Sequence, residues 1–366
     1  MPNSSISTAV QVKDLSSDIK QGKGSPAGMQ DNLSPDKTWF SAQCIRKTQE
    51  TRDAFSYEFA PVNAHLNPFA AGAHINVRLP AGKNGKIIQR TYTLSSSPKT
   101  LPTFTLTVKR VNDGCVSNWL ADHLEPGSSL EFTQAAGDFI LPEQTPGRLL
   151  FIAAGSGITP MMSMLRFLSE TANKSEIDCL YYARSPEDII FHKQLATLST
   201  SMKGLRVNYC VEQANDDWFG LSGRINREHF SELEKLSKYE IYLCGPAPFM
   251  AAACETLKTL GVGDYQIHKE IFAVDMSAHA LQTQAKVQFS GEQHAHLMTK
   301  KTLLEEAESR GLTIASGCRS GICKTCRCKK VSGETVNLLN GQRSSAANEY
   351  ILPCVTQALS DTIMEI

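Results

Sequence analysis

The run 148-RLLFIAAGSGITPMMSM-164 decides the fold of its part of the chain, because it joins a strand to a helix through a glycine loop. Its first seven residues are almost all apolar, which is typical of a strand buried on both faces. The loop contains Gly155 and Gly157, and Pro160 suits the first turn of a helix over 160–170. A buried strand followed at once by a helix predicts an α/β domain with a parallel sheet.

The same alternation continues towards the C-terminus and defines one domain. We expect a nucleotide-binding α/β domain over residues 146–274. Its further expected strands and helix are 177–184, 204–212, 240–245, 248–261 (the helix) and 265–272.

The glycine loop is a candidate dinucleotide site. Gly155 and Gly157 allow phosphates to approach the backbone, and Thr159 adds a hydroxyl at the helix start, where amides are free to bind anions. The loop is not the G-x-G-x-x-G pattern, because Pro160 stands where the third glycine would be.

Before this domain, residues 37–145 contain short β-type runs broken by glycine and proline. Their regular spacing predicts a small antiparallel β-barrel. The expected strands are 55–60, 74–80, 90–96, 103–111 and 129–133.

After an expected linker at 275–285, the chain carries a cysteine loop. Cys318, Cys323, Cys326 and Cys354 follow the spacing C-x4-C-x2-C-x27-C, which is that of plant-type 2Fe-2S sites. We expect these four metal ligands to hold a 2Fe-2S cluster in an α+β, β-grasp ferredoxin domain over residues 286–366. Structural zinc is the alternative, although zinc ribbons favour two separated C-x2-C pairs.

The cluster predicts a further cofactor upstream. A single 2Fe-2S cluster takes one electron at a time, whereas a nicotinamide gives two as a hydride. A flavin accepts the pair and releases single electrons, so we expect a flavin site between the two.

The run 90-RTYTLSSSP-98 resembles the R-x-Y-[S/T] signature of the ferredoxin-NADP reductase superfamily. The resemblance implies that Arg90 pairs with a flavin phosphate, that the Tyr92 ring packs beside the isoalloxazine, and that Thr93 faces its N5. The chemistry agrees, because a guanidinium forks onto phosphate oxygens and an aromatic ring stacks on a planar one.

A second element, 109-KRVNDGCVSNWL-120, also resembles that superfamily. Gly114, Val116 and Ser117 match the residues that bind the flavin diphosphate at a helix start, where anionic oxygens are favoured. The resemblance therefore implies FAD rather than FMN.

The glycine loop, including Pro160, matches the superfamily's G-[ST]-G-I-[AT]-P, and 244-CGP-246 matches its C-G-P element. This resemblance implies that Cys244 lies near the nicotinamide C4, with Gly245 and Pro246 shaping the pocket. Thr93 and Cys244 are the expected catalytic residues.

The run 268-HKEIF-272 matches as well, which implies that Glu270 and Phe272 lie near the flavin. The plant enzymes of the superfamily end their reductase domain with a stacking tyrosine that this chain lacks.

The choice between NADH and NADPH is expected at 182-YARSPED-188. Arg184 and Ser185 favour the extra phosphate of NADPH, whereas Glu187 and Asp188 keep NADH open.

The composition sets the context. The 366 residues hold 37 Lys plus Arg and 37 Asp plus Glu, so no overall field attracts nucleic acid or an anionic membrane. Residues 1–36 are polar and expected to be a disordered tail. The sequence contains no apolar run of about 20 residues that could span a membrane, nor a signal-peptide core. We expect a cytoplasmic protein with reduced cysteines.

Over residues 38–366 the chain resembles single-chain reductases of bacterial oxygenase systems. This resemblance implies electron transfer from NAD(P)H through FAD and the cluster to a separate terminal enzyme. The runs 137-GDFILP-142 and 340-NGQR-343 look most like reductases of membrane acyl-lipid desaturases, which would bring peripheral membrane association. Reductases of Rieske oxygenases acting on glycine betaine and of hybrid-cluster proteins are the other relatives.

Two other functions stay open, namely a zinc-stabilised scaffold with a decayed nucleotide fold and a reductase that releases reduced flavin. If the chain serves a protein partner, we expect four basic residues near the cluster to dock it, although a solvated face explains them equally well. They are Arg319, Lys324, Lys329 and Lys330.

Overall fold

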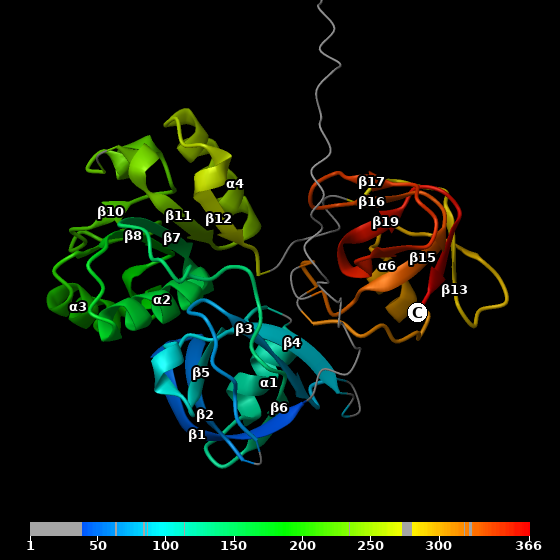
Figure 1. Ribbon diagram of the computed structural model, residues 1–366, viewed down its shortest axis with the longest axis horizontal. Helices are drawn as coiled ribbons and strands as arrows, with labels where there is room; N and C mark the ends of the chain where they lie inside the picture. The colour runs from blue at the N-terminus through cyan, green and yellow to red at the C-terminus, as the bar shows by residue number, and fades with distance from the viewer. Residues whose placement is uncertain are drawn as a thin grey trace, which may run out of the picture. The chain divides into compact units, whose positions relative to one another are not determined.

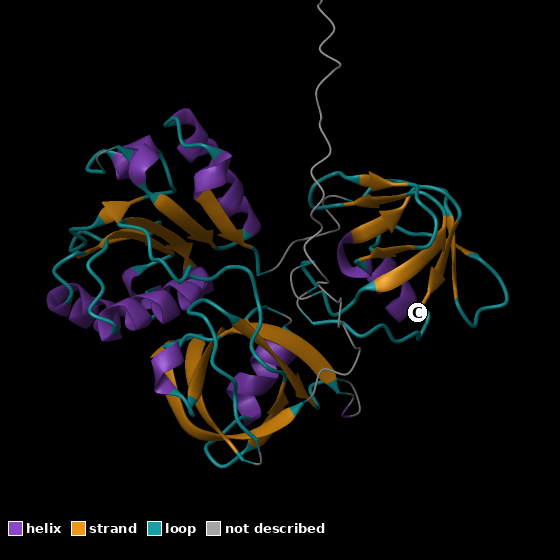
Figure 2. Ribbon diagram, in the orientation of Figure 1, coloured by secondary structure: helices purple, strands orange, loops and turns teal. Residues whose placement is uncertain are grey.

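The computed structural model describes most of the chain as three domains, shown in Figures 1 and 2. The expected tail, part of the expected linker, and two of the four expected cluster ligands, Cys318 and Cys323, lie outside the described residues. The structure describes residues 39–62, 64–82, 85, 87–112, 114–233, 235–272, 280–317, 319–321 and 324–366.

The first domain confirms the predicted antiparallel barrel. Its strands run in the order β4-β3-β6-β1-β2-β5, and a bridge between Leu94 and Leu106 joins the two ends of that order. Packed rings of Phe59, Phe104 and Phe132 fill the interior, with centroids 4.8–5.4 Å apart. The elements are β1 Phe40–Thr51, β2 Ala54–Pro61, β3 His74–Leu79, β4 Ile88–Thr93, a 3-10 turn Pro98–Thr100, β5 Phe104–Lys109, α1 Cys115–His123 and β6 Ser129–Phe132.

The second domain is the predicted parallel α/β sheet, in the order β10-β9-β8-β7-β11-β12. Side chains of α2 and α3 pack on one face of the sheet and those of α4 on the other. The strands that follow β7 in sequence lie first on one side of it and then on the other. Ligands bind at the carboxyl ends of the strands where the strand order reverses in this way. The elements are β7 Arg148–Ala154, α2 Ile158–Glu170, β8 Glu176–Ala183, α3 His192–Ser201, β9 Leu205–Val211, β10 Leu221–Ser222, β11 Glu240–Cys244, α4 Ala247–Thr259 and β12 Ile267–Glu270, with 3-10 turns at Gly155–Gly157, Pro186–Asp188, Arg227–Phe230, Leu236–Lys238 and Asp264–Gln266.

The third domain has the predicted α+β architecture, with a five-stranded mixed sheet β14-β13-β20-β15-β18 and a small sheet β17-β16-β19. Leu281, at the end of the expected linker, exchanges two hydrogen bonds with the Gln357 side chain and is therefore fixed to this domain. The elements are β13 Lys286–Phe289, β14 His296–Leu297, α6 Leu303–Ser309, β15 Cys328–Ser332, β16 Thr335–Asn337, β17 Arg343–Ser344, β18 Glu349–Ile351, a 3-10 turn Pro353–Val355, β19 Thr356–Ala358 and β20 Thr362–Glu365.

Helix α6 begins with a capping box, in which the Thr302 hydroxyl accepts from the Glu305 amide at 3.2 Å while the Glu305 side chain accepts from the Thr302 amide. This local pairing fixes the start of the helix beside the cysteine loop. Across the described ranges, no helix is both long and apolar enough to cross a bilayer.

Candidate functional site

One cavity of about 810 Å³ is lined by residues of all three domains. Its volume is in the range of pockets that bury a ligand. Many of the predicted site residues line it, namely Arg90, Tyr92, Thr93, Gly114, Val116, Ser117, Thr159, Gly245, Pro246, Glu270, Phe272 and Cys354.

One end of the cavity suits anionic oxygens. Helix α1 begins here, and the Ser117 hydroxyl accepts from the Val111 amide at 3.2 Å. A Cβ on Gly114 would lie 2.4 Å from that hydroxyl oxygen, so the helix entry has no room for a side chain. The free amides of a helix start, close to Arg90, form a phosphate cradle of the kind that a flavin diphosphate requires.

The charges at this end are unbalanced. Burial lowers the pKa of Arg90, and the nearby Arg319 guanidinium of the third domain lowers it further. Arg319 is itself paired with Glu308, but among the described residues its buried Nε has no hydrogen-bond partner. An anionic group between these side chains would relieve the repulsion, so the residues present fit FAD.

The middle of the cavity is built where the barrel meets the nucleotide domain. Thr93, at the end of β4, donates from Oγ1 to Glu270 Oε2 at 3.4 Å, and Glu270 ends β12. His74 Nδ1 lies 3.8 Å from the other Glu270 oxygen, Oε1. Tyr92 and Phe272 add aromatic surface beside this cluster. A planar ring with a polar atom near Thr93 fits this arrangement.

The nucleotide end of the cavity is formed by the loops after β7 and β11. Thr159 donates from Oγ1 to the Ser156 carbonyl at 3.0 Å, and both residues line the cavity. A Cβ on Gly157 would lie only 2.2 Å from the Cys244 carbonyl oxygen, so the two loops touch through their backbones. Gly155 has a φ of +53°, the left-handed conformation that glycine adopts readily.

Besides Cys244, five residues predicted to bind flavin or nucleotide do not line the cavity itself. Gly155, Gly157 and Pro160 lie in the loop and helix start that support it, and Arg184 and Ser185 follow β8.

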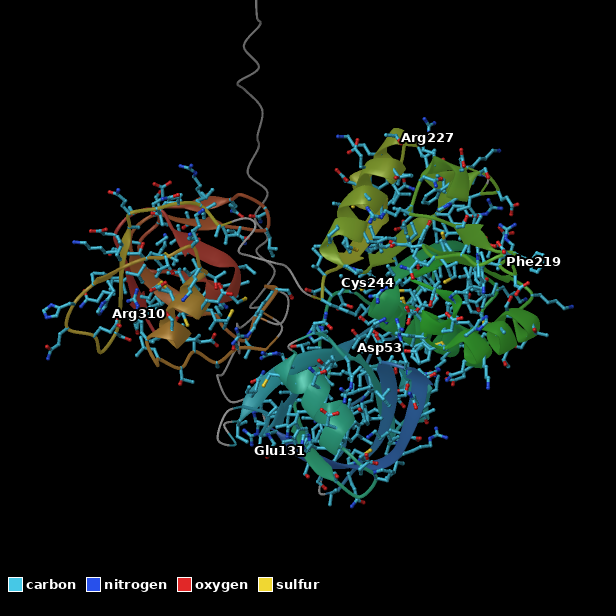
Figure 3. All side chains as sticks on the ribbon, turned by 180° about the vertical axis from the view of Figure 1, so that it is seen from behind. Asp53, Glu131, Phe219, Arg227, Cys244 and Arg310 are labelled. Carbon is cyan, nitrogen blue, oxygen red and sulfur yellow. The ribbon has the colours of Figure 1, made fainter. Side chains whose placement is uncertain are left out.

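Cys244, which is expected to lie near the nicotinamide C4, is buried at the end of β11. The side chain has no exposed surface, does not line the cavity, and lies inside the nucleotide domain (Figure 3). Burial, with a smaller contribution from Glu270, raises the pKa of its thiol well above the ordinary value. Its contact with a nicotinamide therefore stays a prediction.

The carboxyl edge of strands β8, β9 and β10 carries the residues that are expected to bear on coenzyme choice. Arg184, Glu212 and Gly223 follow their strands in register, and the Gln213 amide donates to the Arg184 carbonyl at 2.8 Å. The sequence reasoning missed Arg224, which is 88% exposed and 4.0 Å from Glu212. This edge therefore offers two exposed guanidiniums and one carboxylate to a ribose or its phosphate.

Asp188 and Glu187, the acidic residues that left NADH possible as the coenzyme, differ in burial and pairing. Asp188 is buried and paired with Arg52 at 3.2 Å, so its carboxylate is already engaged. Glu187 is exposed, and a hydrogen bond from the Ser185 side chain lowers its pKa.

The two described cysteines predicted to bind the cluster, one after the loop and one in the 3-10 turn Pro353–Val355, have buried thiols. Cys326 and Cys354 are 2% and 3% exposed within one hydrophobic cluster. Arg319, Gly321 and Lys324 all have positive φ angles, so the described part of the loop turns sharply. Thiolates on such a loop suit a 2Fe-2S cluster.

Cys328 packs against the same core, and burial raises the pKa of its thiol to about 11. This position agrees with a packing role rather than with a fifth ligand.

The expectation that Lys330 is a docking charge was wrong. Its side chain has no exposed surface, and Nζ donates to the Gly333 and Ser344 carbonyls at 3.0 and 2.9 Å. Arg319 lines the cavity and is about one-third exposed, so its docking role stays a prediction. Lys324 is exposed, and Lys329 is one-third exposed beside Glu365.

Comparisons with known proteins agree with this geometry. Three family models match the chain, described as oxidoreductase FAD-binding domain over residues 41–140, oxidoreductase NAD-binding domain over 151–255 and 2Fe-2S iron-sulfur cluster binding domain over 289–359. A glycine betaine monooxygenase reductase subunit of Chromohalobacter salexigens is 30% identical, with 90% of this chain and 97% of the relative covered. The chain belongs to this family of iron-sulfur flavoprotein reductases.

A second relative of the reductase is an NADH oxidoreductase HCR of Escherichia coli, 30% identical over 87% of this chain and 94% of the relative. Phthalate dioxygenase reductase shares the fold at a TM-score of 0.64 and 24% identity, covering 90% of this chain and 98% of that one. The resemblance to ferredoxin-NADP reductases with a C-terminal ferredoxin domain is thus confirmed. The reductase is an oxidoreductase with FAD, NAD(P)H and a 2Fe-2S cluster as its cofactors.

Replacing Arg90 with alanine is expected to weaken FAD binding by about 10- to 100-fold, because a charge-assisted hydrogen bond contributes roughly 1.5–3 kcal/mol. Fluorescence titration of the flavin-free reductase measures the dissociation constant. Arg46→Ala is the control, since Arg46 is exposed and pairs with Glu58 on the barrel. Equal FAD affinities in the two variants would contradict a role for Arg90 in binding the phosphate.

Proposed function

We propose that the reductase passes electrons from NAD(P)H through FAD and its 2Fe-2S cluster to a separate terminal oxygenase. One observation carries the proposal. The same cavity is lined by Arg90 of the flavin barrel, by Thr159 and Gly245 of the nucleotide domain, and by Cys354, a predicted cluster ligand. The residues expected to bind the donor, the flavin and the cluster therefore line one cavity.

The chain's own residues act mainly by positioning. With FAD bound, Gly114 and Ser117 would hold its diphosphate, Arg90 would neutralise the phosphate charge, and Thr93 would offer a hydroxyl to the flavin ring. FAD supplies the conversion between a two-electron donor and a one-electron acceptor when bound. Enclosure in a partly apolar cavity keeps reactants close and in a fixed orientation.

The expected desaturase partner gains no support from the relatives. Besides the glycine betaine monooxygenase reductase subunit, a stachydrine N-demethylase reductase subunit of Rhizobium meliloti is 29% identical over 95% of its length. These names favour the alternative partner, a Rieske-type monooxygenase that acts on a small quaternary ammonium compound. A cytoplasmic location stays a prediction.

A visible spectrum of the purified reductase tests the first part of the proposal. Flavin bands with iron-sulfur shoulders that bleach on NAD(P)H addition are expected, and a colourless zinc protein would contradict it. Reconstitution tests the partner. A Rieske oxygenase should turn over substrate with this reductase, whereas turnover only with a membrane desaturase would restore the first expectation.

Replacing Arg184 with alanine is expected to lower kcat/KM for NADPH about 10-fold and to change that for NADH less than about 3-fold, because a guanidinium contacts only the extra phosphate. Steady-state kinetics with both coenzymes measure the ratio. Lys258→Ala, exposed on α4, is the control. Equal losses for NADPH and NADH would show that Arg184 does not read the phosphate.

Reversing Lys324 and Arg327 to glutamate is expected to raise the KM for the oxygenase about 10-fold and to flatten its salt dependence. Both side chains are exposed beside the cysteines, and the Arg327 guanidinium lies 4.7 Å from the centre of the exposed Tyr350 ring. Lys258→Glu on the nucleotide domain controls for net charge. An unchanged salt dependence of the KM would show that the docking surface lies elsewhere.

A further inference from the structure

Arg319 lines the flavin cavity although it belongs to the third domain. It directly follows Cys318, a predicted cluster ligand, in the cysteine loop. The same cavity is lined by Arg90 of the barrel, and the charge of Arg319 is close enough to lower the pKa of Arg90. Two positive side chains at one end of a cavity repel each other, whereas an anion bound between them attracts both.

The surroundings of Arg90 leave most of its positive charge uncompensated. Its Nη1 donates to the carbonyl of Gln89, the preceding residue of β4, at 2.8 Å. Burial and Arg319 lower the pKa of Arg90, and the Glu308 carboxylate opposes them with a smaller effect. The carbonyl accepts a hydrogen bond but carries no full charge, so this end of the cavity favours an anionic ligand.

The ion pair between Arg319 and Glu308 leaves part of the Arg319 guanidinium free to bind a ligand. Glu308 lies in α6 and is paired with Nη2, and both side chains are about one-third exposed. Exposed ion pairs contribute little to stability. Nε is buried, and no group within the described ranges accepts a hydrogen bond from it. A guanidinium has donors along more than one edge, so a phosphate oxygen could accept from Nε while the Glu308 pair persists.

The charge of the ligand calls for a second cation. A diphosphate carries two negative charges, and Arg90 at the start of α1 supplies one full positive charge. Lys109 also lines the cavity, but its ammonium is already paired with Asp53 of the same domain at 3.4 Å. An ammonium is a single point charge, whereas the guanidinium of Arg319 keeps an unpaired edge. Arg319 is therefore the better second partner.

We infer that Arg319 binds a phosphate of FAD together with Arg90, so that the cysteine loop supplies one wall of the flavin site. The inference rests on the proposed function only in that FAD is the cofactor. Arg319 has a φ of +57°, a left-handed conformation that is uncommon for a residue with a side chain. Such a conformation persists where contacts offset its cost. FAD binding therefore also holds the loop that carries the cluster.

Fluorescence titration of the flavin-free reductase, with its cluster retained, tests the inference. The probes are FAD and riboflavin, which lacks phosphate. Arg319→Ala is expected to raise the dissociation constant for FAD about 10-fold and that for riboflavin less than about 2-fold, because only FAD offers a charge-assisted hydrogen bond. Arg319→Lys should recover part of the FAD affinity, since it keeps the charge but loses the forked donors.

Glu308→Gln is the matched control, because it breaks the same ion pair and removes a carboxylate that competes with phosphate. It should bind FAD at least as tightly as the wild type. The inference would be overturned by an unchanged FAD affinity in Arg319→Ala. Equal weakening of FAD binding in Arg319→Ala and Glu308→Gln would also overturn it, because Arg319 would then act only through the ion pair.

The visible absorbance of the cluster shows whether each variant is folded around it. If Arg319→Ala loses the cluster, the comparison of FAD with riboflavin in Arg319→Lys decides, and equal changes for the two flavins would overturn the inference. A wild-type protein that binds no FAD, or whose FAD is not reduced by NAD(P)H, would instead overturn the proposed function.

Discussion

Replacing Cys354 with serine is expected to lower electron transfer to cytochrome c or to the oxygenase at least about 100-fold, while NAD(P)H-dependent ferricyanide reduction stays within about 2-fold, because the cluster loses a ligand but the flavin does not. Cys354 is buried in the core of the third domain and also lines the flavin cavity. Steady-state assays with cytochrome c and with ferricyanide measure the outcome. The iron content and the visible spectrum show whether the cluster is present.

Cys328→Ser is the matched control, since Cys328 packs against the same core but is not expected to bind iron. It should keep the cluster and both activities. Equal loss of ferricyanide and cytochrome c reduction in Cys354→Ser would contradict the order of transfer from flavin to cluster. Full activity with both acceptors would contradict its assignment as a ligand.

Replacing Gly157 with alanine is expected to destabilise the nucleotide domain by about 3 kcal/mol, the upper end of the usual cost of overpacking. The new methyl group would meet backbone atoms of Cys244 and Gly245 within 2.2–2.8 Å, and backbone cannot rotate away as a side chain can. A lower urea midpoint and a raised KM for NAD(P)H are expected. FAD binding should change little, because the diphosphate cradle lies on the barrel.

Gly147→Ala separates this clash from a general effect of removing glycine. Gly147 lies just before β7, and a Cβ there would meet no heavy atom within 4 Å. Its urea midpoint should match that of the wild type. If the two variants had equal stability, the loops after β7 and β11 would not pack as closely as described.

Much of the fold could be predicted because its signals are local. The glycine loop after a buried strand specifies the parallel sheet, and turn residues divide the barrel into strands. The first strand, Phe40–Thr51, was missed. Its second half is mostly exposed and polar, so it pairs through its backbone and lacks the apolar alternation of a half-buried strand.

The site was predicted less completely because much of it depends on register. His74 escaped notice because its partner Glu270 lies 196 positions away, and only the pairing of β3 with β4 brings it beside Thr93. Lys330 was assigned to the surface together with Lys329. Neighbouring residues on a strand point to opposite faces, and composition alone does not say which face is buried.

The backbone contact between Gly157 and the Cys244 carbonyl has a consequence for engineering the reductase. The loops after β7 and β11 touch through their main chain, which point substitutions scarcely reshape without destabilising the domain. By contrast, Arg184 and Arg224 are exposed side chains that follow strands β8 and β10 at the carboxyl edge of the sheet. We therefore expect that substitutions of Arg184 can change coenzyme preference without disturbing the backbone contact at Gly157.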